Sequence, residues 1–362
     1  RRTQPGTLRL DAKVSQAAGL RIHLRTRRGL ETFVRDELLQ HPSLNERFKL
    51  LKVSAGCVAI AAQAGFSLRE LYQLRTVGSI HFVLGVVPTS KDIDAAALAK
   101  LIASPLTQRL CRKLTDGQPR YRLKFMRAKV PHATAQSVIN QAFAQCAELL
   151  NDPRQAPWAI EIYPEKIGSS VELRPRVAPD PRFQYRADDV PASTHPPLAA
   201  AMAYLAGHAQ NEVVWDPFCG SGLELVERSL LGGVQTLIAS DIAPKAVEVV
   251  RLNLEQAGVP SEMVTAHTCD FREHHRIEGL TPGSVSLMIT NPPLGRRVRV
   301  ADMPGLFEAI FKVAAASLRC GGRLVILNPL KRPNVPASLK LEHRHIVDVG
   351  GFECRLEKWA KQ

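Results

Sequence analysis

The chain has 362 residues, of which 45% are hydrophobic and 23% are charged, a balance typical of a globular protein with more than one domain and not of a disordered or collagen-like chain. Its 48 lysine and arginine residues exceed its 34 aspartate and glutamate residues, giving a formal net charge of +14 that makes a polyanion such as nucleic acid the first partner to consider. Seven scattered cysteines without a C-x-x-C pair argue against a disulfide framework or structural zinc site and favour a reducing cytoplasm, and no apolar run is long enough to predict a membrane span.

The first half of the chain is predicted to alternate short strands and helices, as in compact α+β modules. The expected strands are 21–26, 81–87, 121–127, 158–162 and 170–173, with a strand or hairpin over 48–62, and the expected helices are 30–39, 67–74 and 133–150. Between Arg109 and Lys129 lie eight basic residues and a single acid, Asp116. This half therefore carries much of the positive charge.

Residues 175–197 contain six prolines and no sustained periodicity, which indicates a linker. After it the pattern becomes a regular alternation of strands and helices, which favours a doubly wound parallel sheet. The expected strands are 213–215, 236–240, 263–269, 285–290 and 323–328, and a hairpin over 341–349 and 352–359 would add the last strand antiparallel. A helix over 305–318 is expected to end in a left-handed cap at Gly321-Gly322.

The sequence DPFCGSG, residues 216–222, follows the first of these strands. Its glycines permit a tight turn and close approach to a ligand, and Asp241, at the end of the next strand, could bind ribose hydroxyls. A plain glycine turn, with Asp241 as a helix cap, is the alternative. The third glycine of a dinucleotide site is replaced by Leu225, and Asp216 would repel a pyrophosphate but could hold a cationic amino-acid group. The motif therefore favours S-adenosylmethionine.

Two further features follow later strands. Asp270 and Phe271 come after the third strand, where they could contact an adenine amine and ring, although Asp270 could equally cap the next segment. The fourth strand ends in Asn291-Pro292-Pro293-Leu294. The Asn291 side-chain oxygen and the Pro292 carbonyl could accept both hydrogens of an exocyclic amine and aim its lone pair at a methyl group, while the prolines hold that geometry.

These motifs resemble those of class I S-adenosylmethionine-dependent amino methyltransferases. Together with YRLKFMRAK, WAIEIYPE and STHPPLAAAMAYLA, the whole chain is similar to the THUMP-domain RNA methyltransferases that modify the guanine 2-amino group in tRNA or large-subunit rRNA. The resemblance implies a ferredoxin-like module at 18–90, a THUMP domain at 91–176, a linker at 177–194 and a Rossmann-like class I methyltransferase domain at 195–362.

The resemblance also implies individual roles. The implied cofactor-binding residues are Asp216, Pro217, Cys219, Gly220, Gly222, Asp241, Ile242, Asp270 and Phe271, and the implied catalytic residues are Asn291, Pro292, Pro293 and Leu294. RNA phosphates would be contacted by Arg120, Arg122, Lys124, Arg127, Arg296 and Arg297. No metal is required. Cys219 is interpreted as a small buried residue rather than a thiol nucleophile.

One position departs from the family pattern, because an aromatic residue usually stands where this chain has Leu294. Another residue would then stack the base, or activity would be low, or the target would differ. Alternatives to RNA guanine methylation are methylation of DNA adenine or protein glutamine, and RNA binding by a chain whose methyltransferase half is degenerate.

Overall fold

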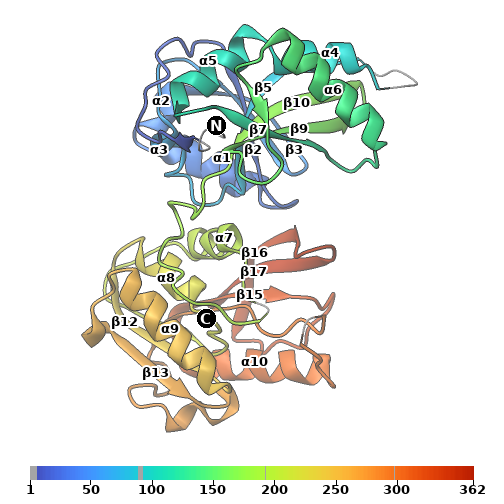
Figure 1. The fold of residues 1–362 in the computed structure, drawn as a ribbon. Coiled ribbons are helices and arrows are strands. Elements are labelled where there is room, and N and C mark those ends of the chain that lie inside the picture. The colour runs from blue at the N-terminus through green and yellow to red at the C-terminus, as the bar shows by residue number, and fades with distance from the viewer. Residues whose placement is uncertain (1–5, 89–92, 192, 297) are drawn as a thin grey trace. The chain divides into compact units, whose positions relative to one another are not determined.

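The computed structural model describes residues 6–88, 93–191, 193–296 and 298–362. They divide into two compact units, each with its own sheet (Figure 1). The first unit holds the described residues through Thr26 together with Val34–Arg182, and the second holds Arg27–Phe33 and Phe183–Gln362. Within the described ranges, no helix combines the length and apolarity needed to cross a membrane.

The first unit is built on an eight-stranded sheet with the strand order β3-β4-β2-β5-β10-β9-β7-β8. Its strands are β2 (Arg21–Arg25), β3 (Phe48–Ser54), β4 (Cys57–Ala62), β5 (Ser79–Val87), β7 (Arg120–Phe125), β8 (Leu150–Asn151), β9 (Trp158–Glu165) and β10 (Gly168–Pro175). A separate antiparallel pair joins β1 (Thr7–Leu8) to β6 (Thr115–Asp116). The helices are α1 (Glu31–Gln40, its first three residues grouped with the second unit), α2 (Leu44–Arg47), α3 (Leu68–Leu71), α4 (Ala95–Ile102), α5 (Pro105–Leu114) and α6 (His132–Gln145).

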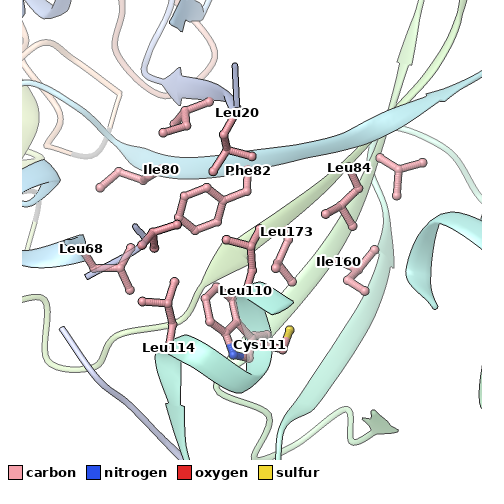
Figure 2. Packing of buried hydrophobic residues seen from close by; sticks show 14 of the residues in the cluster. Leu20, Leu68, Ile80, Phe82, Leu84, Leu110, Cys111, Leu114, Ile160 and Leu173 are labelled. Carbon is pink, nitrogen blue, oxygen red and sulfur yellow. The ribbon is translucent and has the colours of Figure 1, made fainter. Parts of the chain in front are cut away.

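The core of this unit lies between the sheet and its helices. Figure 2 shows Phe82, Leu110 and Leu173 converging in it from β5, α5 and β10, and all three side chains are fully buried. The alternation of buried and exposed residues along the strands supplies this apolar face, since successive side chains point to opposite faces of a sheet. The helices α4 and α5 were not predicted from the sequence.

Several sequence expectations for this unit need correction. The helix expected over 133–150 ends at Gln145, because Cys146 and Leu149 are buried in the core and Leu150 pairs with Arg120 as the start of β8. The helix expected over 67–74 is capped by the Ser67 side chain but spans only Leu68–Leu71. The strand expected over 121–127 ends at Phe125, and Arg127 has a positive φ of 56°.

The proposed 18–90 and 91–176 modules contribute strands to one continuous sheet, because β5 pairs with β10. The described residues between Pro175 and Pro196 form neither helix nor strand. Even so, some of their side chains are well packed: the Arg182 guanidinium donates to the Leu74 carbonyl oxygen at 2.9 Å, and Tyr185 is buried. The limits of the four proposed segments stay a prediction.

The second unit contains a seven-stranded sheet with the order β13-β12-β11-β14-β15-β17-β16. Its strands are β11 (Glu212–Asp216), β12 (Val234–Asp241), β13 (Val264–Thr268), β14 (Val285–Thr290), β15 (Leu318–Asn328), β16 (Leu339–Asp348) and β17 (Glu353–Lys361). Its helices are α7 (Pro196–Ala206), α8 (Leu223–Ser229), α9 (Pro244–Gln256), α10 (Met303–Ser317) and the short 3-10 turns η1 (Ser261–Met263) and η2 (Phe271–Arg276). The first five strands of the order are parallel and β17 is antiparallel, which confirms the doubly wound prediction and its antiparallel last strand.

Helices cover both faces of this sheet. Val214 of β11 belongs to the core formed with α7, α8 and α9, whereas the next residue, Trp215, belongs to the core formed with α10 and η2. Adjacent residues of one strand thus serve two cores, as a buried parallel sheet requires. The carboxyl ends of β11, β12 and β14 lie side by side at one edge, where doubly wound folds bind ligands.

The expected glycine cap at Gly321-Gly322 is wrong. The helix α10 ends at Ser317, and its C-cap Leu318 is already extended and begins β15. Gly321 has a φ of 72°, but it lies within β15, where the pairing with β14 shifts register between Val285 and Leu287. The glycine accommodates an irregularity of the strand instead of ending a helix.

Candidate functional site

The loop after β11 forms one wall of a cavity of about 730 Å³ in the second unit. Gly220 and Gly222 have φ values of 50° and 77°, which favour glycine. A Cβ on Gly222 would lie 2.2 Å from the Val250 Cγ2 atom of α9, whereas a Cβ on Gly220 would meet nothing closer than 3.7 Å. Gly222 therefore allows α8 and α9 to pack closely, and only Gly220 of the two lines the cavity.

Asp216, at the end of β11, is fully buried. Its Oδ1 atom accepts hydrogen bonds from the Thr290 hydroxyl at 2.7 Å and from the Phe218 amide at 3.0 Å. Its Oδ2 atom is buried without a hydrogen-bond partner among the described residues. Burial raises the pKa of this carboxyl well above its ordinary value, and the negative charges of Glu224 and Asp241 raise it further. The site therefore carries uncompensated negative charge when these groups ionise.

Asp241 ends β12 and lines the cavity. Its two carboxylate oxygens accept backbone N–H groups from Gly220 at 3.0 Å and Ala243 at 2.9 Å. A carboxylate has about four lone-pair sites, so both oxygens keep capacity to accept further hydrogen bonds. The neighbouring Ile242 is 72% exposed and lies on the same cavity wall. Both the capping and the ligand-binding interpretations of Asp241 are compatible with this geometry.

Other predicted cofactor residues lie outside the cavity lining. Asp270 accepts the Arg272 amide at 2.9 Å and caps η2, which is the alternative recognised from the sequence. Phe271 is 3% exposed and packs against Phe218, with ring centroids 4.9 Å apart. Pro217 and Asp216 are buried beneath the wall. Phe218 was not among the predicted site residues although it lies within the same motif, and its ring does line the cavity.

Cys219 lines the cavity but is 2% exposed. Burial raises the pKa of its thiol well above the ordinary value, as do the carboxylates of Asp216 and Asp241. A thiol in this environment stays protonated and is a poor nucleophile. The geometry therefore favours the interpretation of Cys219 as a small packing residue.

The Asn291-Pro292-Pro293-Leu294 segment follows β14 directly, and all four residues line the cavity. The Asn291 Nδ2 atom donates to the Thr194 hydroxyl at 2.8 Å, and that hydroxyl donates to the Glu224 carboxylate. The Asn291 Oδ1 atom is buried without a hydrogen-bond partner among the described residues. A strong acceptor therefore remains available in the cavity wall.

Leu294 packs at the edge of both cores of the second unit. Across the lining, Phe352 lies in the turn between β16 and β17, and the Arg296 guanidinium carbon stands 5.1 Å from its ring centroid. Arg27 and Arg186 also line the cavity. Neither Phe352 nor these two arginines were among the predicted site residues, since no local motif marks them.

Four of the predicted RNA-binding residues belong to the first unit. Arg122, Lys124 and Arg127 are exposed, whereas the Arg120 guanidinium pairs with the Asp152 carboxylate at 2.9 Å. Arg297 lies outside the described residues. The proposed phosphate contacts of all six basic residues stay predictions.

The sheet order of the second unit and a cavity at the carboxyl ends of its parallel strands define a class I methyltransferase fold. The whole chain is similar in structure to TrmN from Thermus thermophilus, with a TM-score of 0.73 at 21% identity, covering 95% of this chain and 100% of that one. It is also similar to a possible methylase from Clostridium difficile 630, with a TM-score of 0.66 at 14% identity, covering 95% and 98% of the two chains. These likenesses confirm the α/β, Rossmann-like fold predicted for the C-terminal half, whereas the THUMP and ferredoxin-like modules stay predictions.

Sequence comparisons agree for the C-terminal half. Residues 183–344 match the family model described as RMKL-like, methyltransferase domain. Over 142 residues the chain is 28% identical to the tRNA (guanine(10)-N2)-dimethyltransferase of Methanothermobacter thermautotrophicus, covering 38% of this chain and 39% of that protein. The corresponding enzyme of Methanocaldococcus jannaschii is 29% identical over 142 residues, covering 39% of each. The chain thus spans 39% of the length of these curated relatives.

The residues present fit S-adenosylmethionine. The unpaired Asp216 Oδ2 atom lies beside the acidic groups Glu224 and Asp241, a charge distribution suited to a cationic ligand and unsuited to a pyrophosphate. Phe218 and Ile242 supply apolar walls in the same cavity. Pockets for ligands of this size commonly have a volume of about 300 to 1,000 Å³, and this cavity falls in that range.

Proposed function

We propose that the chain is an S-adenosylmethionine-dependent RNA methyltransferase that methylates the exocyclic 2-amino group of a guanosine in tRNA or rRNA. The observation that carries this proposal is the Asn291 Oδ1 atom, which is buried and has no hydrogen-bond partner among the described residues. Asn291 lines the same cavity as the acidic residues Glu224 and Asp241. The similarity of the C-terminal half to tRNA guanine-N2 dimethyltransferases and the net charge of +14 support RNA as the substrate.

An exocyclic amine is a weak nucleophile because its lone pair is delocalised into the ring. Hydrogen bonds from its two N–H groups to the Asn291 Oδ1 atom and the Pro292 carbonyl oxygen would favour a tetrahedral nitrogen and orient its lone pair. The cofactor, when bound, supplies an electrophilic methyl group. The target nitrogen would take this methyl group as the methyl–sulfur bond breaks, with the bonding electrons remaining on sulfur, and it would lose one proton to solvent. Positioning supplies much of the reduction in barrier.

A different set of residues would hold the cofactor in this proposal. Asp216 and Glu224 balance the charge of its methionine part, Asp241 accepts from the ribose, and Phe218 and Ile242 cover the adenine. We infer that Phe271, being buried, supports the Phe218 ring and does not itself cover the adenine, and that Asp270 acts mainly as a cap.

We infer that RNA docks through basic side chains of the first unit, which the resemblance assigns to a THUMP domain. Arg122, Lys124 and Arg127 are exposed there, whereas Arg120 is paired with the Asp152 carboxylate. Phosphate contacts of this type fix position without reading sequence. The target base would be extruded into the cavity.

The alternatives are weakened by particular residues. The uncompensated acidic group and the available amide oxygen are features that a degenerate site would have no reason to keep, since both are costly to bury. The strong positive charge disfavours a protein glutamine substrate.

Transfer of a labelled methyl group tests the proposal. Wild-type protein and the Asn291→Ala variant are incubated with tRNA, rRNA, duplex DNA and bulk protein, and the modified nucleotide is identified by mass spectrometry. We expect N2-methylguanosine in RNA with wild type and a loss of roughly 100-fold or more in the variant. Label in DNA or protein alone, or an unaffected variant, would contradict the assignment.

A further inference from the structure

Three polar side chains from distant parts of the second unit form a continuous hydrogen-bonded chain. Thr194 precedes α7, Glu224 lies in α8, and Asn291 follows β14. Thr194 is 7% exposed and Glu224 is 3% exposed, so bulk water competes little for their hydrogen bonds. All three line the cavity in which we place the reaction.

When the Glu224 carboxylate is ionised, these groups allow a single direction for the chain. An ionised Glu224 carboxylate can only accept, so the one hydroxyl proton of Thr194 must go to it. The Thr194 oxygen then has only lone pairs left for Asn291, which must offer its amide NH₂ group, and this contact measures 2.8 Å. The amide oxygen of Asn291 is thereby turned away from Thr194.

The orientation matters because an asparagine amide has two ends of nearly equal size. If the amide were rotated by half a turn, an NH₂ group would face the amine of the substrate, and two donors would oppose one another. With Thr194 in place, the Oδ1 atom is the end left without a partner. It is therefore ready to accept from the substrate before the substrate arrives, so binding need not reorganise it.

We propose that Thr194 and Glu224 are positioning residues that fix the amide orientation of Asn291 for the methylation reaction. This inference rests on the proposed function, and it adds two residues that carry no recognisable motif. Neither needs to touch the reacting nitrogen. Their effect is transmitted through the Asn291 amide.

The sharpest test replaces the Thr194 hydroxyl by a methyl group of similar size. Thr194→Val removes both hydrogen bonds, and Thr194→Ser retains the hydroxyl. We expect Thr194→Val to lower kcat by roughly 10- to 100-fold, the effect of losing an orienting hydrogen bond, with KM for RNA and Kd for S-adenosylmethionine within about threefold of wild type. Thr194→Ser should recover most of the lost kcat.

Thr107→Val serves as the matched control for the substitution itself. Thr107 is a fully buried threonine of α5 whose hydroxyl donates to the Leu101 carbonyl oxygen at 2.8 Å, and it belongs to the first unit. It should lose stability without a comparable fall in kcat. An equal fall in kcat for Thr107→Val and Thr194→Val would overturn the proposal.

A second measurement does not depend on activity. Hydrogen exchange of the Asn291 side-chain amide is followed by NMR in protein labelled at asparagine, with Asn291→Ala identifying the signal. We expect slow exchange in wild type and Thr194→Ser and fast exchange in Thr194→Val. Exchange that is unchanged by Thr194→Val refutes the positioning role, even if the wild-type protein methylates no RNA. Absence of methyl transfer by wild type, with the expected exchange pattern, would instead refute the proposed function alone.

Discussion

The Asp216→Asn substitution should separate stability from ligand binding. Asp216 is fully buried, and among the described residues only its Oδ1 atom has hydrogen-bond partners, the Thr290 hydroxyl and the Phe218 amide. Asparagine can keep both bonds through its own oxygen while removing a charge that lies near Glu224 and Asp241. We expect the variant to bind S-adenosylmethionine much more weakly and yet to be more stable than wild type at neutral pH.

The size of the stability gain follows from the unpartnered Oδ2 atom. A buried polar group without a partner costs about 1 to 3 kcal/mol, and more when it is charged. Asparagine leaves an unpartnered but neutral NH₂ group in the same place, so we estimate a net gain of about 1 to 2 kcal/mol. For a unit of this size that corresponds to an increase in Tm of roughly 2 to 8 °C.

The gain should depend on pH with a defined sign. Burial raises the pKa of Asp216 in the folded state, so the folded protein holds this proton more tightly than the unfolded chain, whose carboxyl has a pKa near about 3.9. The contribution of Asp216 to the free energy of unfolding of the wild type is therefore greatest below about pH 3.9, and it falls as the pH rises toward the raised folded-state pKa. The advantage of Asp216→Asn should grow over the same interval.

Thermal unfolding from about pH 4.5 to 8 measures this difference, and calorimetry with S-adenosylmethionine measures binding. Asp270→Asn is the control, because the Asp270 carboxylate caps η2 and lies near the Arg272 guanidinium, so its loss should not stabilise the protein. A Tm at pH 7.5 that is lower in Asp216→Asn than in wild type would refute the reasoning, as would undiminished ligand binding.

Three further substitutions have defined expectations. Gly222→Ala places a Cβ atom 2.2 Å from the Val250 side chain at a residue with positive φ, so we expect a loss of roughly 2 to 4 kcal/mol in the free energy of unfolding, measured by denaturant titration. Phe352→Ala should lower kcat/KM for RNA by roughly 5- to 150-fold if this cavity-lining ring stacks the target base, as about 1 to 3 kcal/mol of stacking implies; an unchanged kcat/KM would remove it from that role. Arg122→Ala combined with Lys124→Ala should weaken RNA binding and reduce its logarithmic salt dependence by about 2, measured by fluorescence anisotropy over a salt series.

Sequence patterns were most informative about the second unit. Some of its parallel strands are short, mainly apolar runs bounded by turn residues, as in β14, where every residue is buried. Such runs can be recognised without tertiary information. The first unit was harder to predict because its elements depend on long-range contacts: β8 is two residues long and exists only through pairing with β7.

The glycine error has a similar origin. A pair of glycines after an amphipathic helix is a typical stop signal, and the sequence around Gly321 contains no contrary cue. The position of the helix end is set instead by β15, which begins at Leu318 to pair with Val285 of β14. The pairing of β15 with β14 therefore determined where the helix ends, and the local glycine signal did not.

In the candidate site, too, residues next to a strand end could be predicted from the sequence, whereas side-chain directions set by packing could not. Asp241 and Asn291 were predicted because each directly follows a strand whose end can be located in the sequence, and both line the cavity. Phe271 also follows a strand end, but the motif does not set the direction of its ring, which packs against Phe218. Its contact with the adenine stays a prediction.

Thr194 and Glu224 illustrate what local patterns cannot supply. Thr194 stands in a proline-rich stretch, and Glu224 reads as an ordinary acidic residue in the first turn of a helix, where a carboxylate would usually be solvated. Burial raises the pKa of its carboxyl. Burying a carboxyl group is less favourable for folding than burying an apolar side chain at the same position. Burial of the Glu224 carboxyl lowers the stability of the folded protein, so α8 does not need this residue for its own stability. Because Glu224 is linked through Thr194 to the Asn291 amide, its role in orienting that amide is the better explanation for its presence.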